Sequence, residues 1–150
     1  MVAFRFRLAS VLRYRERYRE ERRLEFVREA KERKQLTDEI RRLEQLLSSQ
    51  IEGMADEGGQ CVTGADLQLR GEFILHTTQR IQEYRTLLVT VEQRLEEKRL
   101  VLLHADREVK SLEQLRARRQ EQHRRQENAK EQRNADEVGQ RRYLDQKRLT

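Results

Sequence analysis

Residues 74–112 decide the fold, and they read ILHTTQRIQEYRTLLVTVEQRLEEKRLVLLHADREVKSL. Alternate steps of three and four residues through this stretch give a series in which ten of twelve positions are apolar or aromatic: Ile74, Thr77, Ile81, Tyr84, Leu88, Val91, Leu95, Lys98, Leu102, Ala105, Val109 and Leu112. This 3.5-residue repeat predicts a helix with one apolar seam, which coils around a second helix. The repeat also argues against disorder, which low hydrophobic content and 40% charged residues would otherwise suggest.

A second stripe with the same spacing lies upstream, at Leu36, Ile40, Leu43, Leu47 and Met54, with Gln50 the exception. Four of the six glycines fall between residues 53 and 64, and such a cluster in a chain without proline marks a turn. Thr63 and Asp66 have the spacing of a capping box, which opens a helix.

These signals predict an all-α fold with two long helices in an antiparallel coiled-coil hairpin. We expect one domain over residues 1–150, with helices over about 8–52 and 65–145 and a turn over 53–64.

Placing Glu52 opposite Ala65 gives an expected register between the helices. It pairs Leu43 with Ile74, Leu36 with Ile81, Phe26 with Val91, and residues 4–8 with 109–113. The second helix then overhangs the start of the first, and we expect residues 113–150 to lack an intramolecular partner. A helix that is polar on all sides is marginal until a partner stabilises it.

The N-terminal half of the first helix fits the stripe poorly. There the register gives Leu12, Arg15, Arg19, Arg22, Phe26, Glu29 and Arg33. Apolar residues lie beside it instead, at Val11, Tyr14, Tyr18, Leu24 and Val27, so we expect the contact face to drift toward them.

Both ends of the chain are basic. Residues 1–30 hold nine arginines against five glutamates, and residues 116–150 hold eleven basic against six acidic residues. Such ends steer an acidic partner. The single cysteine, Cys61, fits a reducing compartment, and no apolar stretch has the length of a signal core or a membrane span. We expect a soluble, cytoplasmic protein.

No residues have the spacing of a catalytic, metal or cofactor site. His76 and His104 are too far apart on one straight helix to share a metal ion, and His123 lies further along. No glycine is followed by the Lys-Ser or Lys-Thr of a phosphate loop. We expect neither enzyme activity nor a cofactor or small-molecule substrate.

The arginines between residues 13 and 23 admit two interpretations. A solvated, charged helix face is favoured over a nucleic-acid site, because glutamates are interleaved and no aromatic platform alternates with these arginines. Two interpretations also stay open for Phe73: an aromatic that covers the seam, or part of an exposed docking stripe with Thr77, Arg80 and Tyr84.

Short motifs along the whole chain resemble the flagellar export protein FliJ family. They are the opening Phe4-Arg-Phe-Arg-Leu8, Val11-Leu12 and Tyr14-Arg15, the central Glu72-Phe73-Ile74, and the near-terminal Asp136-Glu137-Val138-Gly139-Gln140-Arg141. The resemblance implies a cytoplasmic hairpin of the flagellar type III export apparatus, peripherally associated with the inner face of the cell membrane. Members resemble the central stalk of rotary ATPases.

The resemblance also implies partners. The terminal ends of the hairpin would enter the ring of the hexameric export ATPase, and we expect its contacts at Arg13, Arg15, Arg19, Arg22, Arg23, Arg116, Arg119, Arg124 and Arg125. The cytoplasmic domain of the export gate membrane protein would contact Phe73, Thr77, Arg80 and Tyr84, of which Phe73 alone matches the family's character. Export chaperones are further partners that the resemblance implies. The alternatives are a stalk of a virulence secretion system or rotary ATPase, and a basic coiled coil that binds nucleic acid.

Overall fold

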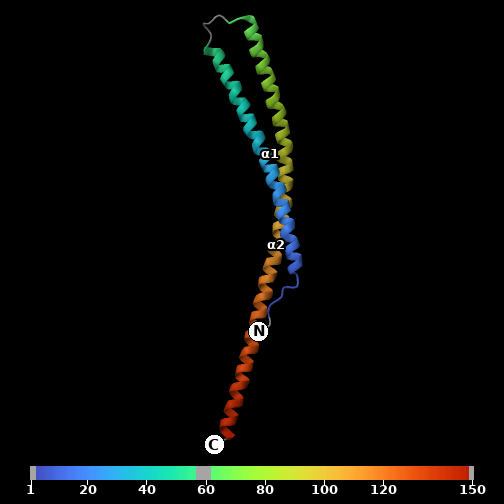
Figure 1. Cartoon of the computed structure of the whole chain (residues 1–150), viewed down its shortest axis with the longest axis vertical. Helices are drawn as coiled ribbons and strands as arrows, with labels where there is room; N and C mark the ends of the chain where they lie inside the picture. Colours follow the sequence, from blue (N-terminus) through green and yellow to red (C-terminus); the bar gives the residue numbers. More distant parts are fainter. Residues whose placement is uncertain (1–2, 57–61, 149–150) are drawn as a thin grey trace. The chain divides into compact units, whose positions relative to one another are not determined.

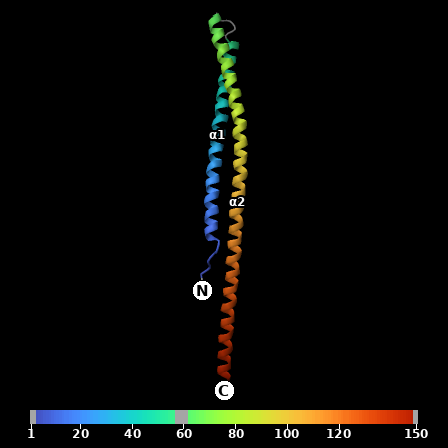
Figure 2. The same ribbon diagram turned by 90° about the vertical axis from the view of Figure 1, so that its right-hand side faces the viewer.

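The computed structural model describes residues 3–56 and 62–148, which form two long α-helices and no strand (Figure 1). Helix α1 spans Ala9–Asp56 and helix α2 spans Gly64–Arg148. The helices pack against each other in opposite directions, as both views show (Figures 1 and 2). This helical hairpin confirms the predicted all-α fold class.

The chain divides into two compact units, and each is described separately. The turn unit comprises residues 20–103. The terminal unit comprises the described residues 3–19 and 104–148.

Helix α1 runs to Asp56, beyond the expected end near residue 52. Gly53 therefore lies inside the helix, with a negative backbone φ and no atom within 4 Å of the place that a Cβ would occupy. A single glycine lowers helix stability by only about 1 kcal/mol relative to alanine, so it does not end a helix of this length. The remaining turn glycines, Gly58 and Gly59, and Cys61 lie outside the described residues.

The predicted capping box opens α2. The backbone N–H and the hydroxyl of Thr63 donate to Oδ2 of Asp66 at 3.3 and 2.5 Å, and the Asp66 N–H donates to the Thr63 hydroxyl at 3.3 Å. These bonds satisfy donors that have no partner within the helix. The same bonds lower the pKa of Asp66.

The seam on α2 is confirmed. All twelve predicted positions are buried or half-buried. Thr77 and Ile81 are 4% and 5% exposed in the turn unit, where Val91 is fully covered. Ala105 and Val109 are equally buried in the terminal unit.

The expected register is wrong by two helical turns. Ile81 forms a buried cluster with Ile40 and Leu43, against which Leu47, Tyr84 and Leu88 pack. Leu43 thus meets Ile81 rather than Ile74. The error arose from placing the turn directly after residue 52. The two registers differ by one heptad, so the apolar repeat fits both of them.

Ion pairs across the helices agree with the observed register. Arg85 lies 2.5 Å from Glu44, and Lys98 lies 3.0 Å from Glu25. Both pairs belong to the turn unit, so charge and apolar packing specify the same alignment there.

Of the five apolar residues beside the register of α1, only Tyr18 is half-buried, so the contact face does not drift toward the other four. Tyr14, Leu24 and Val27 are 63%, 53% and 51% exposed, and Val11 is exposed as well. The charged register positions Arg15, Arg19, Arg22 and Glu29 are half-buried instead. They hold this face because carboxylates and guanidinium groups of α2 lie opposite several of them.

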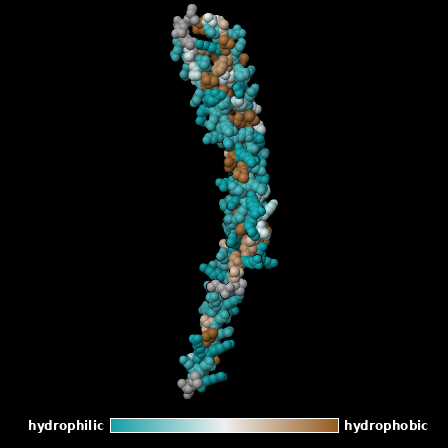
Figure 3. All heavy atoms as spheres, in the orientation of Figure 1, coloured by the Kyte–Doolittle hydropathy of each residue, from teal (hydrophilic) through white to brown (hydrophobic). Residues whose placement is uncertain are grey.

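The surface is mainly hydrophilic, with scattered apolar patches (Figure 3). In the turn unit, exposed apolar side chains include Ile51, Leu67, Leu69 and Leu75. Neither α1 nor α2, over its described residues, is long and apolar enough to cross a membrane.

Truncating the seam at Ile81→Ala is expected to lower the free energy of unfolding by about 2–5 kcal/mol, because a buried side chain leaves a cavity. Leu75→Ala, on a side chain that is 61% exposed, is the matched control and should change little. Urea unfolding followed by circular dichroism measures both. Equal losses in the two variants would contradict this assignment of the seam.

The register is tested by charge reversal at the Arg85–Glu44 pair. Arg85→Glu should destabilise the hairpin, and adding Glu44→Arg should recover part of the loss, because opposite charges then face each other again. A double-mutant cycle should give a coupling of about 0.2–1 kcal/mol. In the register first expected from the turn, Arg85 lies opposite Glu32, so recovery by Glu32→Arg and not by Glu44→Arg would restore that alignment.

Candidate functional site

Ion pairs replace apolar contacts along much of the N-terminal half of α1. In the terminal unit, Arg15 lies 2.6 Å from Glu108 and Arg19 lies 3.3 Å from Asp106. In the turn unit, Arg22 lies 3.2 Å from Glu25, which also binds Lys98. Three arginines expected to contact a partner thus bind carboxylates of their own hairpin.

Further ion pairs between α1 and α2 occur in the turn unit. Arg94 lies 3.2 Å from Glu32 and 3.6 Å from Glu29, and Arg33 lies 3.3 Å from Glu92. Individual exposed pairs contribute about 0–1 kcal/mol each. A run of such pairs therefore contributes mainly to the alignment of the two helices, because it sets which charged residues face each other.

Three other predicted arginines form pairs within their own helices. Arg23 lies 3.7 Å from Glu20 on α1. Arg124 and Arg125 both bind Glu121 on α2, at 2.8 and 2.9 Å. Their hydrogen bonds lower the pKa of Glu121. Arg124 and Arg125 have highly exposed side chains, so these pairs do not remove them from the surface.

The N-terminal strap, residues 4–8, has no regular structure up to Phe6 and a turn at residues 7–8, and it lies against α2 in the terminal unit. The ring of Phe4 lies 5.8 Å from that of His123, tilted by 57°. The N–H of Ala9 donates to the carbonyl of Phe6 at 3.2 Å, where α1 begins. The strap thus contacts α2 well beyond residue 113, where the unpaired overhang was expected to start. Continuous exposure begins only at Asn128 and runs to Arg148.

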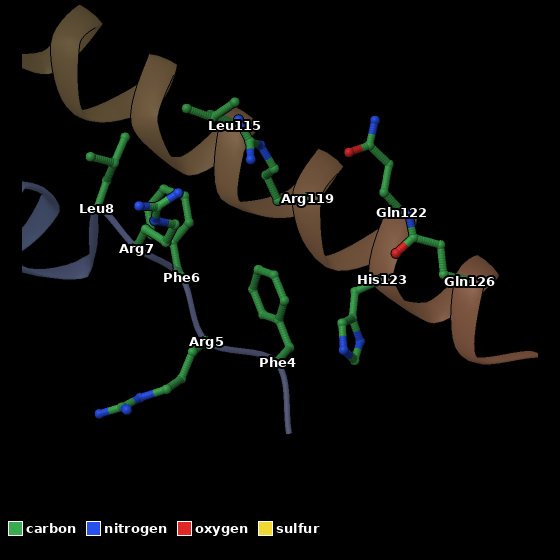
Figure 4. A pocket seen from close by; sticks show the side chains of 10 residues that line it. All are labelled: Phe4, Arg5, Phe6, Arg7, Leu8, Leu115, Arg119, Gln122, His123 and Gln126. Atoms are coloured by element: carbon green, nitrogen blue, oxygen red, sulfur yellow. The ribbon is translucent and has the colours of Figure 1, made fainter. Parts of the chain in front are cut away.

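A hollow of about 660 Å³, called here the strap hollow, lies between the strap and α2 (Figure 4). Its apolar lining consists of Phe4, Phe6, Leu8 and Leu115. Its polar lining consists of Arg5, Arg7, Arg119, Gln122, His123 and Gln126. No carboxylate is among these lining residues, so their formal charge is positive.

A second hollow of about 800 Å³ shares residues 4–7 of the strap. Arg13 and Arg116 line it together with one carboxylate, Glu16. Within the described part of the chain, no carboxylate lies in ion-pair range of Arg13, Arg116 or Arg119. The two hollows therefore bring together the predicted arginines that are not engaged elsewhere.

The fold exposes some residues of the predicted docking stripe on α2 and buries others. Phe73 is 38% exposed, and Arg80 is exposed and donates a hydrogen bond to the Tyr84 hydroxyl at 3.1 Å. Thr77 is buried in the seam, and Tyr84 packs against the Ile81 cluster. Thr77 is therefore excluded from an exposed stripe, because the seam register turns it toward α1.

No group of three or more His, Cys, Asp or Glu side chains suited to a metal ion occurs in the two described segments, 3–56 and 62–148. Of the three histidines, His104 lies 3.8 Å from Glu108, and His123 contacts the strap.

Residues 4–148, which include the strap and both helices, match the family described as flagellar FliJ protein. The chain belongs to this family. Searches for similar curated proteins and for similar solved structures gave no match. As a FliJ-family member, the chain is a non-catalytic component of the flagellar export apparatus and acts together with that machinery in flagellum biogenesis.

Sequence reasoning on this FliJ-family chain missed Phe4, Arg5, Phe6 and Arg7 as site residues. The signal was present as the alternation of aromatic and basic residues at positions 4–7, ahead of the first helix. These residues were used only as a motif of the family.

The ion pairs predict how the stability of this FliJ-family hairpin depends on pH. The hydrogen bond from Lys98 lowers the pKa of Glu25, and those from Lys110 and then Arg19 lower the pKa of Asp106. Carboxylates with a lowered pKa stabilise the fold above their ordinary values of 4.5 for Glu and 3.8 for Asp. That stabilisation is lost as the pH falls through the lowered values.

We therefore expect the thermal midpoint to fall as the pH drops below about 4.5. Glu25→Gln should flatten this dependence, since its carboxylate no longer titrates. Glu83→Gln removes an equal charge at an exposed site and should leave the dependence unchanged. Circular dichroism melts between pH 7 and pH 3 measure the thermal midpoint. A midpoint that rises on acidification would contradict the stabilising role of these ion pairs.

Proposed function

We propose that this chain is a stalk-like activator of the hexameric flagellar export ATPase, which it contacts through its terminal unit. The observation that carries the proposal is the group of uncommitted arginines around the strap: Arg13, Arg116 and Arg119, joined by Arg5 and Arg7. Membership of the FliJ family supports the choice of the export machinery as the partner.

The ion pairs of the hairpin favour fewer contact residues than the nine arginines first expected. Arg15, Arg19 and Arg22 bind carboxylates of the hairpin, so a partner would have to displace those carboxylates first. Arg124 and Arg125 share one glutamate but remain exposed, so they join the contact as secondary residues. We place the primary contact at the uncommitted arginines, because no internal ion pair has to break there.

The C-terminal part of α2 extends the proposed contact. Side chains from Asn128 to Arg148 are exposed, and Arg133, Arg141 and Arg142 are among them. Basic residues near the C-terminus of a helix also interact favourably with its macrodipole. A positively charged helix end suits a ring interior lined with acidic groups.

We also propose that the chain is an adaptor to the export gate and to export chaperones. For the gate, the support is the partly exposed Phe73 and, on the same helix, Arg80, whose guanidinium group lies 5.7 Å from the Tyr84 ring centre. For the chaperones, and for a cytoplasmic location at the inner face of the cell membrane, the support is the family alone.

The activator proposal predicts that Arg13→Glu, Arg116→Glu and Arg119→Glu together weaken stimulation of the export ATPase. A loss of about 1.4 kcal/mol in binding would raise the concentration for half-maximal stimulation about tenfold. ATP hydrolysis by the ATPase is measured over a titration of the chain.

The matched control reverses Lys31, Lys34 and Arg41 to glutamate. These residues are exposed in the turn unit and change the net charge equally. The same weakening in both triple variants would show an unspecific charge effect and contradict the proposed contact. Wild-type chain that is folded yet gives no stimulation would exclude the activator role and leave the adaptor role.

A further inference from the structure

We propose that the strap hollow binds an acidic peptide segment that carries an apolar side chain. This binding site extends the proposed function and rests on it for the identity of the biological partner, because Arg119 belongs both to the hollow and to the proposed ATPase contact. The binding itself follows from the hollow and is tested without the ATPase.

The charge of the hollow selects the acidic part of the ligand. Arg5, Arg7 and Arg119 line it, and no carboxylate does. Guanidinium groups bind carboxylates through paired hydrogen bonds, which are stronger than neutral ones. The carboxamides of Gln122 and Gln126 add further donors at the same wall.

The apolar lining selects the other part of the ligand. Phe4, Phe6, Leu8 and Leu115 form one side of the hollow, and the first two are half-buried against α2. A volume of about 660 Å³ falls in the range of roughly 300–1,000 Å³ that holds ligands of several side chains. An acidic ligand without an apolar group would leave this side in contact with water.

The backbone of the strap favours a peptide over a nucleic acid. Residues 3–6 belong to no regular element, and among the described residues the N–H groups of Arg5 and Arg7 donate to no backbone carbonyl. A segment with unpaired backbone groups is able to form hydrogen bonds with a bound peptide. A stacked base needs a free aromatic face, whereas the Phe4 ring already contacts His123.

The probe for the test is a fluorescently labelled peptide that alternates Asp and Glu with one Phe and one Leu. Binding to the full chain is measured by fluorescence anisotropy. The comparison probes are the same peptide with Ser at both apolar positions, an oligothymidylate of equal charge, and vesicles of phosphatidylserine and phosphatidylcholine. Preference for the apolar-bearing peptide supports the proposal, and preference for the oligothymidylate or the vesicles overturns it.

Two variants of equal charge locate the binding. Arg7→Glu with Arg119→Glu should weaken binding at least about tenfold, because two guanidinium groups of the hollow are reversed. Lys31→Glu with Arg41→Glu reverses two exposed basic residues of the turn unit that do not line the hollow, and it should weaken binding no more than about twofold because salt screens such charges.

Equal weakening by both variants, or no binding of the peptide to the wild type, would overturn the site. Phe6→Ser should weaken binding of the apolar-bearing peptide and leave the serine peptide unaffected, which separates the apolar contact from charge. Circular dichroism confirms that each variant is helical. Peptide binding without ATPase stimulation would refute the proposed function alone, and stimulation without peptide binding would refute the site alone.

Discussion

Packing of Ile81 against Ile40 and Leu43 fixes which residues of α1 meet which residues of α2 in the turn unit. The apolar stripe turns one face of each helix inward, but a slide of one heptad would keep the same face inward, so the stripe alone does not select the register. The cross-helix pairs Glu44–Arg85 and Glu25–Lys98 flank seam positions and match the observed register. Apolar burial and charge therefore specify the alignment together.

The sequence was sufficient to predict the features that depend on local periodicity or local hydrogen bonding. The seam from Ile74 to Leu112 and the cap at Thr63 are of this kind, since each is encoded within a few residues. The register was not predictable from the glycines, because Gly53 sits in an uninterrupted helix where its lack of a side chain costs little. Thr77 was placed both in the seam and on the docking stripe, and only the helix opposite decides between the two.

The sequence predicted that the candidate site is basic, but it did not predict how the arginines of the site are arranged. Reading residues 11–23 as one basic surface treated every arginine alike, whereas carboxylates more than 80 residues away bind Arg15 and Arg19. Such distant partners cannot be assigned without the correct register. The strap was missed for a related reason: a search for helical periodicity passes over five residues that alternate with period two.

Within the terminal unit, the division of the arginines suggests an order of events. Hydrogen bonds from Lys110 and Arg19 lower the pKa of Asp106, which binds both side chains. An acidic partner that approached Arg19 would compete with Asp106, whereas at Arg119 it would meet a guanidinium group that has no carboxylate in ion-pair range among the described residues. Exposed ion pairs are individually weak, so replacing Asp106 and Glu108 by the carboxylates of a partner bound beside the strap would cost little.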